Sequence, residues 1–143
     1  KPSSQPVVVS QASHVNGWDS SDPMTTGGTL WDSAILLARQ LVLAPEFVAG
    51  RHVLELGAGT GAVGMVAKRL GARLLLSDLP SMIPLLQANW RLNFEEKTGL
   101  EGAETLEGVR ALAWQEAATS WLSGGHDFSR VLMSDVLYHQ PQY

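Results

Sequence analysis

The chain has 143 residues, of which 45% are hydrophobic and 17% charged, and its formal net charge is −4. This length and composition predict one globular domain with enough apolar residues to build a core. The negative charge argues against a nucleic-acid partner, and the absence of cysteine excludes disulfides and cysteine-based zinc sites. No apolar run approaches the ~20 residues of a membrane span, so we expect no membrane partner and a cytoplasmic location, with the nucleus as the alternative.

The first part of the chain, residues 1–28, is expected to be a lead-in to the main domain. Its β-branched run at 6–10 predicts a short strand, and turn-forming residues dominate from 11 to 28. Apolar residues then recur with helical spacing from 30 to 42, which predicts a helix with Asp32 or Ser33 as its N-cap. Pro45 and Gly50 are expected to end this helical stretch.

The main domain, residues 29–143, alternates apolar runs with helical patterns. Strands are predicted at 53–56, 74–77, 109–114 and 130–134, and helices at 62–70 and 81–93, with a short helix and loop at 115–125. The strands are apolar throughout rather than alternating. The sequence therefore predicts an α/β fold with a Rossmann-like, mostly parallel sheet and helices on both faces.

A run of glycines joins the first predicted strand of this domain to the next helix. Gly57, Gly59 and Gly61 let the backbone turn sharply and let a ligand approach where a Cβ would collide. The helix that follows directs its free N–H groups toward the same space. In open parallel sheets, this crevice at the carboxyl ends of the strands is where nucleotide-like ligands bind.

The glycine spacing alone leaves two ligands open. Gly57, Gly59 and Ala62 also satisfy the dinucleotide pattern, so NAD is one alternative. Glu55 places a carboxylate just before the glycines, which suits a cationic ligand such as S-adenosylmethionine (SAM) better than a diphosphate. Asp78 ends the next strand and is suited to accept the ribose hydroxyls of either ligand; a second interpretation makes it the cap of the following helix.

The sequence Glu-Leu-Gly-Ala-Gly-Thr-Gly at positions 55–61 resembles motif I of the seven-β-strand SAM-dependent methyltransferases. The wider pattern is similar to the protein-lysine methyltransferase subfamily often called methyltransferase-16-like. It includes Gly28-Thr-Leu-Trp31-Asp32, Asp78-Leu79, Asn89 to Asn93, Ala113-Trp114 and Ser134-Asp135-Val-Leu-Tyr138. The resemblance extends from about residue 7 onward and implies SAM as the cofactor and a lysine of a protein substrate as the methyl acceptor.

The resemblance also implies which residues form the site. The cofactor-binding residues are expected to be Trp31, Glu55, Gly57, Ala58, Gly59, Asp78, Leu79, Trp114 and Ser134. Trp114 ends a predicted strand, where its indole would pack on adenine, although a tryptophan there is also typical of core packing. Trp31 at the head of a helix allows the same two interpretations.

Asp135 and Tyr138 follow the last predicted strand and are the candidate catalytic residues. A lysine ammonium has a pKa near ~10.4 and must lose a proton before it attacks a methyl group. Asp135 would orient the ammonium and draw the proton away, and Tyr138 would offer its ring to the cation. The alternative is a turn cap and a rim residue. The histidines have no metal-ligand spacing, and no metal site is expected.

Two further functions stay open at this point: an NAD-dependent oxidoreductase, and a SAM-binding module without activity. Members of the resembled family continue with further strands, so the C-terminal strands of the methyltransferase sheet are expected to be missing from this chain. Residues 131–134 would then form an unpaired apolar edge, which predicts self-association through that strand.

Overall fold

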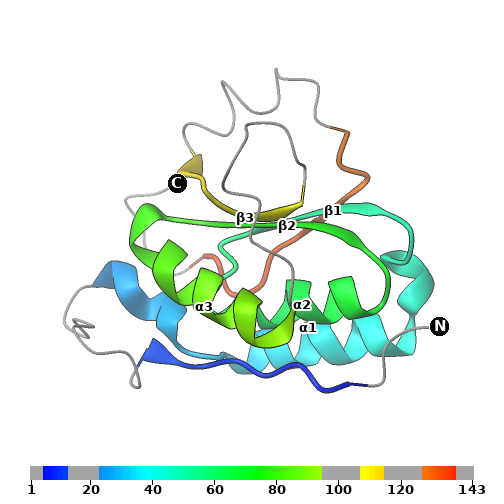
Figure 1. Cartoon of the computed structure of the whole chain (residues 1–143), viewed down its shortest axis with the longest axis horizontal. Coiled ribbons are helices and arrows are strands. Elements are labelled where there is room, and N and C mark those ends of the chain that lie inside the picture. The colour runs from blue at the N-terminus through cyan, green and yellow to red at the C-terminus, as the bar shows by residue number, and fades with distance from the viewer. Residues whose placement is uncertain (1–4, 13–22, 95–106, 115–126, 138–143) are drawn as a thin grey trace.

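The computed structural model describes residues 5–12, 23–94, 107–114 and 127–137 (Figure 1). Its strands are β1 (His52–Leu56), β2 (Arg73–Asp78), β3 (Gly108–Ala111) and β4 (Arg130–Leu132). Its α-helices are α1 (Asp32–Leu43), α2 (Ala62–Arg69) and α3 (Ile83–Asn93). Short 3-10 helices occur at η2 (Pro23–Gly28), η3 (Pro45–Phe47) and η4 (Pro80–Met82).

The four strands form one parallel sheet in the order β3-β2-β1-β4. β1 and β2 are central and almost fully buried, which explains why their sequences are apolar rather than alternating. Glu55 of β1 is paired with Leu76 of β2 on one side and with Leu132 of β4 on the other. The predicted parallel α/β sheet is confirmed.

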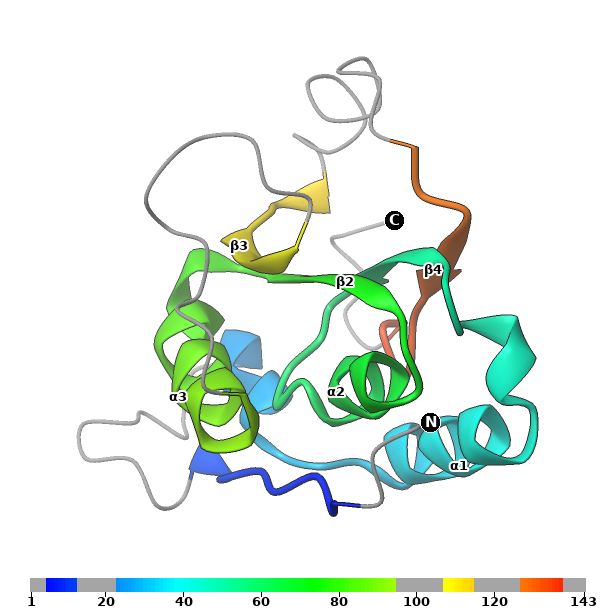
Figure 2. The same ribbon diagram turned by 45° about the vertical axis from the view of Figure 1, so that its right-hand side comes forward.

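The three described α-helices lie on one face of this sheet (Figures 1 and 2). The connections β1-α2-β2 and β2-α3-β3 run in the same direction across the sheet, and right-handed crossovers place both helices on the same side. α1 packs against α2. The helix and loop expected at 115–125 lie outside the described residues, so helix cover is described for one face only.

Several element boundaries differ from the sequence prediction. α1 begins at Asp32 itself, with Trp31 as N-cap and no side-chain capping bond, so the prediction of Asp32 or Ser33 as N-cap is wrong. β3 and β4 are shorter than expected because their partners end. β2 stops at Asp78, opposite Ala111, and β1 turns away at Gly57 directly after its last residue.

The N-terminal strand predicted at residues 6–10 is also wrong. The segment is extended but joins no sheet, because it lies beyond the helices on the side away from the strands (dark blue in Figures 1 and 2). Its backbone bonds instead to side chains of α3. The Val8 N–H donates to Asn93 Oδ1 at 2.8 Å, and the Ser10 N–H donates to Asn89 Oδ1 at 2.7 Å.

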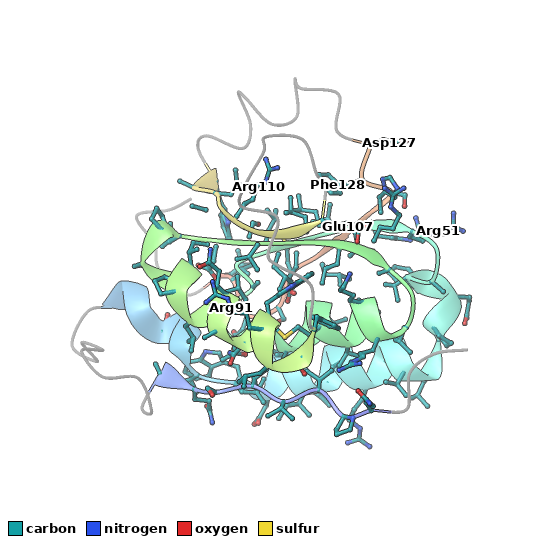
Figure 3. All side chains as sticks on the ribbon, in the orientation of Figure 1. Arg51, Arg91, Glu107, Arg110, Asp127 and Phe128 are labelled. Carbon is teal, nitrogen blue, oxygen red and sulfur yellow. The ribbon has the colours of Figure 1, made fainter. Side chains whose placement is uncertain are left out.

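A carboxylate ties the start of β3 to the neighbouring elements (Figure 3). Glu107 lies 3.4 Å from Lys68 Nζ of α2 and 3.1 Å from Arg73 Nε at the start of β2. The Lys68 ammonium also lies 5.1 Å from the ring centre of buried Trp90 on α3. These contacts connect α2, α3 and the starts of β2 and β3 at the end of the sheet opposite the glycine turn.

The close approach of α2 to the sheet gives a stability prediction. A Cβ at Gly64 would collide with Glu55 Oε2 and with Leu76 Cδ2. Helix propensity alone predicts that Gly64→Ala stabilises the protein by about 1 kcal/mol. We expect the opposite sign, a loss of about 1–3 kcal/mol, because the extra methyl overpacks a filled core. Thermal unfolding of the two proteins measures the sign, and a higher Tm for Gly64→Ala would contradict this packing.

Candidate functional site

A pocket of about 460 Å³ opens at the carboxyl ends of β1, β2 and β4. This is the position in a parallel sheet where ligands are expected, and the volume is in the range of small-molecule sites. The pocket is lined by Thr26, Gly27, Thr29, Trp31, Ala34, Gly57, Ala58, Gly59, Thr60, Ala62, Val63, Asp78, Leu79, Trp114, Ser134, Asp135 and Val136. Twelve of these seventeen residues come from the glycine loop, from α2 or from the chain at or after the ends of β2, β3 and β4.

One wall of the pocket is the glycine loop, residues 57–61. Gly57, Gly59 and Gly61 all have positive φ, at 63°, 54° and 80°. A Cβ at Gly59 would come within 2.6 Å of the Gly27 carbonyl oxygen, and one at Gly57 within 2.9 Å of Val136 Cγ1. The glycines are therefore needed for the turn, as the sequence predicted, and for the close approach of the Gly27 backbone and the Val136 side chain. The approach of a ligand at these glycines stays a prediction.

Asp78 fixes this loop to the end of β2. Its Oδ2 accepts a hydrogen bond from the Gly59 N–H at 2.6 Å, and its Oδ1 accepts one from the Leu79 N–H at 2.7 Å. Burial raises the pKa of the Asp78 carboxyl, and the two amide donors act in the opposite direction. α3 has Met82 as its N-cap with no side-chain bond, so the alternative of Asp78 as a cap for that helix is not what the structure shows.

Glu55 does not face the pocket, and this corrects the sequence interpretation. Its side chain is 2% exposed and accepts a hydrogen bond from the Gly64 N–H of α2 at 2.8 Å. Burial raises the pKa of the Glu55 carboxyl from 4.5 to about 8; the Gly64 amide opposes this rise, and nearby Asp78 adds to it. A buried carboxyl that is mostly protonated at neutral pH is poorly suited to attract a cation. Through its bond to the Gly64 N–H, Glu55 instead supports the glycine loop from behind.

The two predicted tryptophans both lie at the pocket. Trp31 is 47% exposed rather than a core residue, and its indole N–H donates to the Thr26 carbonyl at 3.2 Å. Trp114 follows β3, and its Cζ2 would lie 3.8 Å from a Cβ at Gly57. Leu79 and Ser134 also line the pocket, so every predicted cofactor residue except Glu55 is brought to one cavity.

Several pocket residues are not among the predicted site residues, notably Thr26 and Gly27 of η2. They come from a segment that was expected to be loop, about 30 residues before the glycine loop. The available signal was the Thr-Gly-Gly-Thr run just before Trp31, which offers backbone without Cβ atoms. The Thr26 hydroxyl is buried and has no hydrogen-bond partner within the described chain.

Asp135 lies three residues beyond the end of β4, where it is exposed and lines the pocket. Its φ is 55°, and it is the one non-glycine residue with positive φ in the described segments. Aspartate tolerates this conformation better than most side chains, and such outliers cluster at functional sites. Tyr138, the second predicted catalytic residue, lies outside the described residues. Across the described segments no group of three or more histidine, aspartate or glutamate side chains is arranged to hold a metal.

The helices in the described segments are all too short or too polar to span a bilayer.

Comparison with known proteins finds relatives that are named as methyltransferases. A family model described as lysine methyltransferase matches residues 12–143. The chain is 34% identical over 109 residues to protein N-lysine methyltransferase METTL21A of Danio rerio, covering 76% of this chain and 47% of that protein. It is also 34% identical over 118 residues to protein-lysine methyltransferase METTL21E of Mus musculus, covering 80% and 46%.

A third relative is the protein N-terminal and lysine N-methyltransferase EFM7 of Candida glabrata, 29% identical over 118 residues, which cover 82% of this chain and 46% of the relative. The chain thus spans about half the length of the curated relatives it matches.

The environment of Glu55 gives a pH prediction. Between about pH 4.5 and 8 the unfolded chain ionises Glu55 while the folded protein keeps it protonated. In this range the folded state binds more protons than the unfolded state. The contribution of Glu55 to the free energy of unfolding is therefore fully present below pH 4.5 and is lost as the pH rises toward 8. Relative to Glu55→Gln, the free energy of unfolding of the parent protein should fall by about 1.4 kcal/mol per pH unit across this window. Urea unfolding of both proteins at several pH values measures the difference; a difference independent of pH would contradict the assignment.

Proposed function

The chain belongs to the lysine methyltransferase family, and we propose that it binds SAM in the glycine-loop pocket and supports methyl transfer to a lysine side chain of another protein. The observation that carries the proposal is the convergence on one cavity of the glycine loop, Asp78 and Asp135. Family membership also decides between the two ligands that the glycine spacing left open, in favour of SAM over NAD.

The pocket residues fit this cofactor. The cavity of about 460 Å³ is large enough for a nucleoside with an amino-acid arm, and the glycine loop offers backbone at its wall with no Cβ in the way. Asp78 supplies buried carboxylate oxygens at the wall of the same cavity. When bound, SAM carries a methyl group on a sulfonium, which makes that methyl an electrophile for a neutral amine.

Each pocket residue has a proposed role. Asp78 accepts the ribose hydroxyls, while its bonds to Gly59 and Leu79 keep its oxygens in place. Trp114 and Leu79 pack on the adenine ring. The backbone of residues 57–59 receives the methionine arm, and Trp31 and Ser134 complete the wall. Glu55 holds α2 behind the loop through Gly64 and makes no direct contact.

Asp135 and Tyr138 are proposed to act on the acceptor. Asp135 is exposed at the pocket, so an incoming lysine ammonium can reach it from solvent. Its carboxylate orients the ammonium and receives or relays the proton that must leave before attack. The proposed role of Tyr138 is a ring face for the cation. Positioning of the amine and exclusion of water supply most of the rate gain in such a displacement.

The remaining expectations about partners and organisation are proposals. The net charge of −4 supports a protein partner rather than nucleic acid. No membrane partner is proposed, and the location is proposed to be cytoplasmic, with the nucleus as the alternative. The division into a lead-in (1–28) and a methyltransferase domain (29–143) also stays a proposal. Thr26 and Gly27 of the lead-in line the pocket, so the lead-in would contribute to the site.

Self-association through β4 is a further proposal. β4 is an end strand of the described sheet; Val131 within it is 48% exposed, and Met133 directly after it is 53% exposed. An apolar strand edge of this kind pairs readily with another chain. Light scattering on the 143-residue chain tests it: a concentration-dependent rise in mass supports the proposal, and a monomer at every concentration contradicts it.

The role of Asp78 predicts a loss of cofactor affinity. Asp78→Asn keeps the size of the side chain but removes the charge that strengthens its hydrogen bonds, so we expect SAM binding to weaken by about 1.5–3 kcal/mol, or roughly tenfold to a hundredfold in Kd. Calorimetry measures the change. Asp32→Asn is the matched control, because Asp32 is an exposed carboxylate in the first turn of α1. Equal affinity in both variants would remove Asp78 from the site.

The role of Asp135 predicts a separation of binding from turnover. Asp135→Asn tolerates the positive φ, so it removes the charge without adding backbone strain. We expect SAM affinity within a few fold of the parent and turnover reduced by roughly a hundredfold or more, as for loss of an acid–base group. Steady-state methylation with Asp32→Asn as control measures both. Loss of SAM binding together with turnover would show that Asp135 belongs to the cofactor site.

The experiment for the whole proposal is methyl transfer itself. The protein is incubated with labelled SAM and a protein lysate, and the labelled residue is mapped by mass spectrometry. Label on lysine side chains, lost in Asp135→Asn, supports the proposal. SAM binding with no transfer to any protein would instead favour a binding module without activity.

A further inference from the structure

The extended segment of residues 7–11, here called the strap, is connected to α3 by two asparagines. Asn89 and Asn93 are one helical turn apart and project to the same side of α3. Asn89 binds both backbone groups of Ser10, accepting its N–H at 2.7 Å and donating to its carbonyl at 2.9 Å. Asn93 binds Val8 in the same way, through its N–H at 2.8 Å and its carbonyl. The two amides thus replace a neighbouring strand.

Asn89 differs from Asn93 in one contact. Its amide nitrogen also donates to the carbonyl oxygen of Thr60 in the glycine loop, at 3.0 Å. Both hydrogens of this buried amide are therefore used, one on the strap and one on the loop. Asn93 instead directs its remaining contacts to the Asn89 carbonyl and the Met65 sulfur, and it makes no bond to the glycine loop.

The glycine loop has few other fixed points. The Ala58 N–H donates to the Ser77 carbonyl at 3.0 Å, and the Gly59 N–H donates to Asp78 at 2.6 Å. Both of these hold the loop to the end of β2. The Asn89 bond to Thr60 holds it from the side of α3 and the strap. Glycines are the residues most free to leave a given backbone conformation, so such a loop needs external bonds to keep its shape.

The far end of the strap is connected to the second wall of the pocket. Gln11 Oε1 accepts a hydrogen bond from the Leu30 N–H at 2.9 Å. Leu30 directly precedes Trp31, whose indole is bound to the Thr26 carbonyl. Thr26, Gly27, Thr29 and Trp31 all line the pocket. One short segment is therefore connected to the glycine loop through Asn89 and, through Gln11, to the wall that faces that loop across Gly27 and Gly59.

We propose that the strap sets the spacing of the two pocket walls and that Asn89 is the positioning residue through which it fixes the glycine loop. The strap precedes residues 12–143, the part of the chain that the family model matches. The consequence for SAM affinity rests on the proposed function, whereas the consequence for the shape of the loop does not.

The two asparagines provide a matched pair of variants. Asn89→Asp and Asn93→Asp each keep the acceptor oxygen and lose the donor, and each places a carboxylate in a similar site. Both should lower Tm. Asn89→Asp should also weaken SAM binding by about tenfold or more and raise KM for SAM more than it changes kcat, whereas Asn93→Asp should keep both within about threefold. Calorimetry and kinetics well below the lower Tm give these values.

Amide hydrogen exchange without ligand tests the loop separately. We expect the amides of residues 58–61 to exchange faster in Asn89→Asp than in Asn93→Asp. Equal exchange and equal SAM affinity in the two variants would overturn the proposal. Faster loop exchange in a protein that binds no SAM would support the positioning role while contradicting the proposed function.

Strap variants give a second test if a buried carboxylate prevents folding. Ser10→Pro removes the N–H that Asn89 accepts, and Val8→Pro removes the N–H that Asn93 accepts. Both changes lie in the same extended segment. Only Ser10→Pro should speed exchange at residues 58–61 and weaken SAM binding, and equal effects of the two prolines would contradict a specific role for Asn89.

Discussion

The hydrogen bond from the Gly59 N–H to the Asp78 carboxylate joins the ends of the two central strands, and the pocket is built around it. Gly59 has positive φ and lies against the Gly27 backbone, so neither a side chain nor a different turn fits at this position. The same aspartate accepts the Leu79 N–H at the end of β2. A single carboxylate thus organises two of the segments that border the pocket, and a ligand bound there would meet a preformed backbone surface.

This construction places two carboxyl groups in the interior. Glu55 is fully enclosed between β1 and α2, and Asp78 is nearly so. Burial raises the pKa of both groups, which means that each costs stability when it is ionised. The Glu55 carboxyl accepts the Gly64 N–H and so stabilises the first turn of α2 directly behind the glycine loop.

The fold, the glycine loop and Asp78 could be predicted because the sequence patterns that indicate them are local. Apolar strands, the alternating glycines and Asp78 at the next strand end are close in sequence and follow known geometry. The direction of Glu55 could not be predicted, because β1 is buried on both faces and only the packing of Gly64 decides which side the carboxyl occupies. The strap was predicted as a strand because its β-branched residues suit an extended backbone. Its partners are side chains 79 and 85 residues away, which no local pattern reveals.

The central claim is that the glycine loop and Asp78 form the SAM site, and backbone NMR measures it most directly. Amide resonances of Gly59, Gly61 and Leu79 are followed while SAM, its demethylated product or NAD is added. We expect saturable shifts at these amides with SAM and with the product, and none with NAD at the same concentrations. Shifts confined to residues outside the pocket, or equal shifts with NAD, would contradict it.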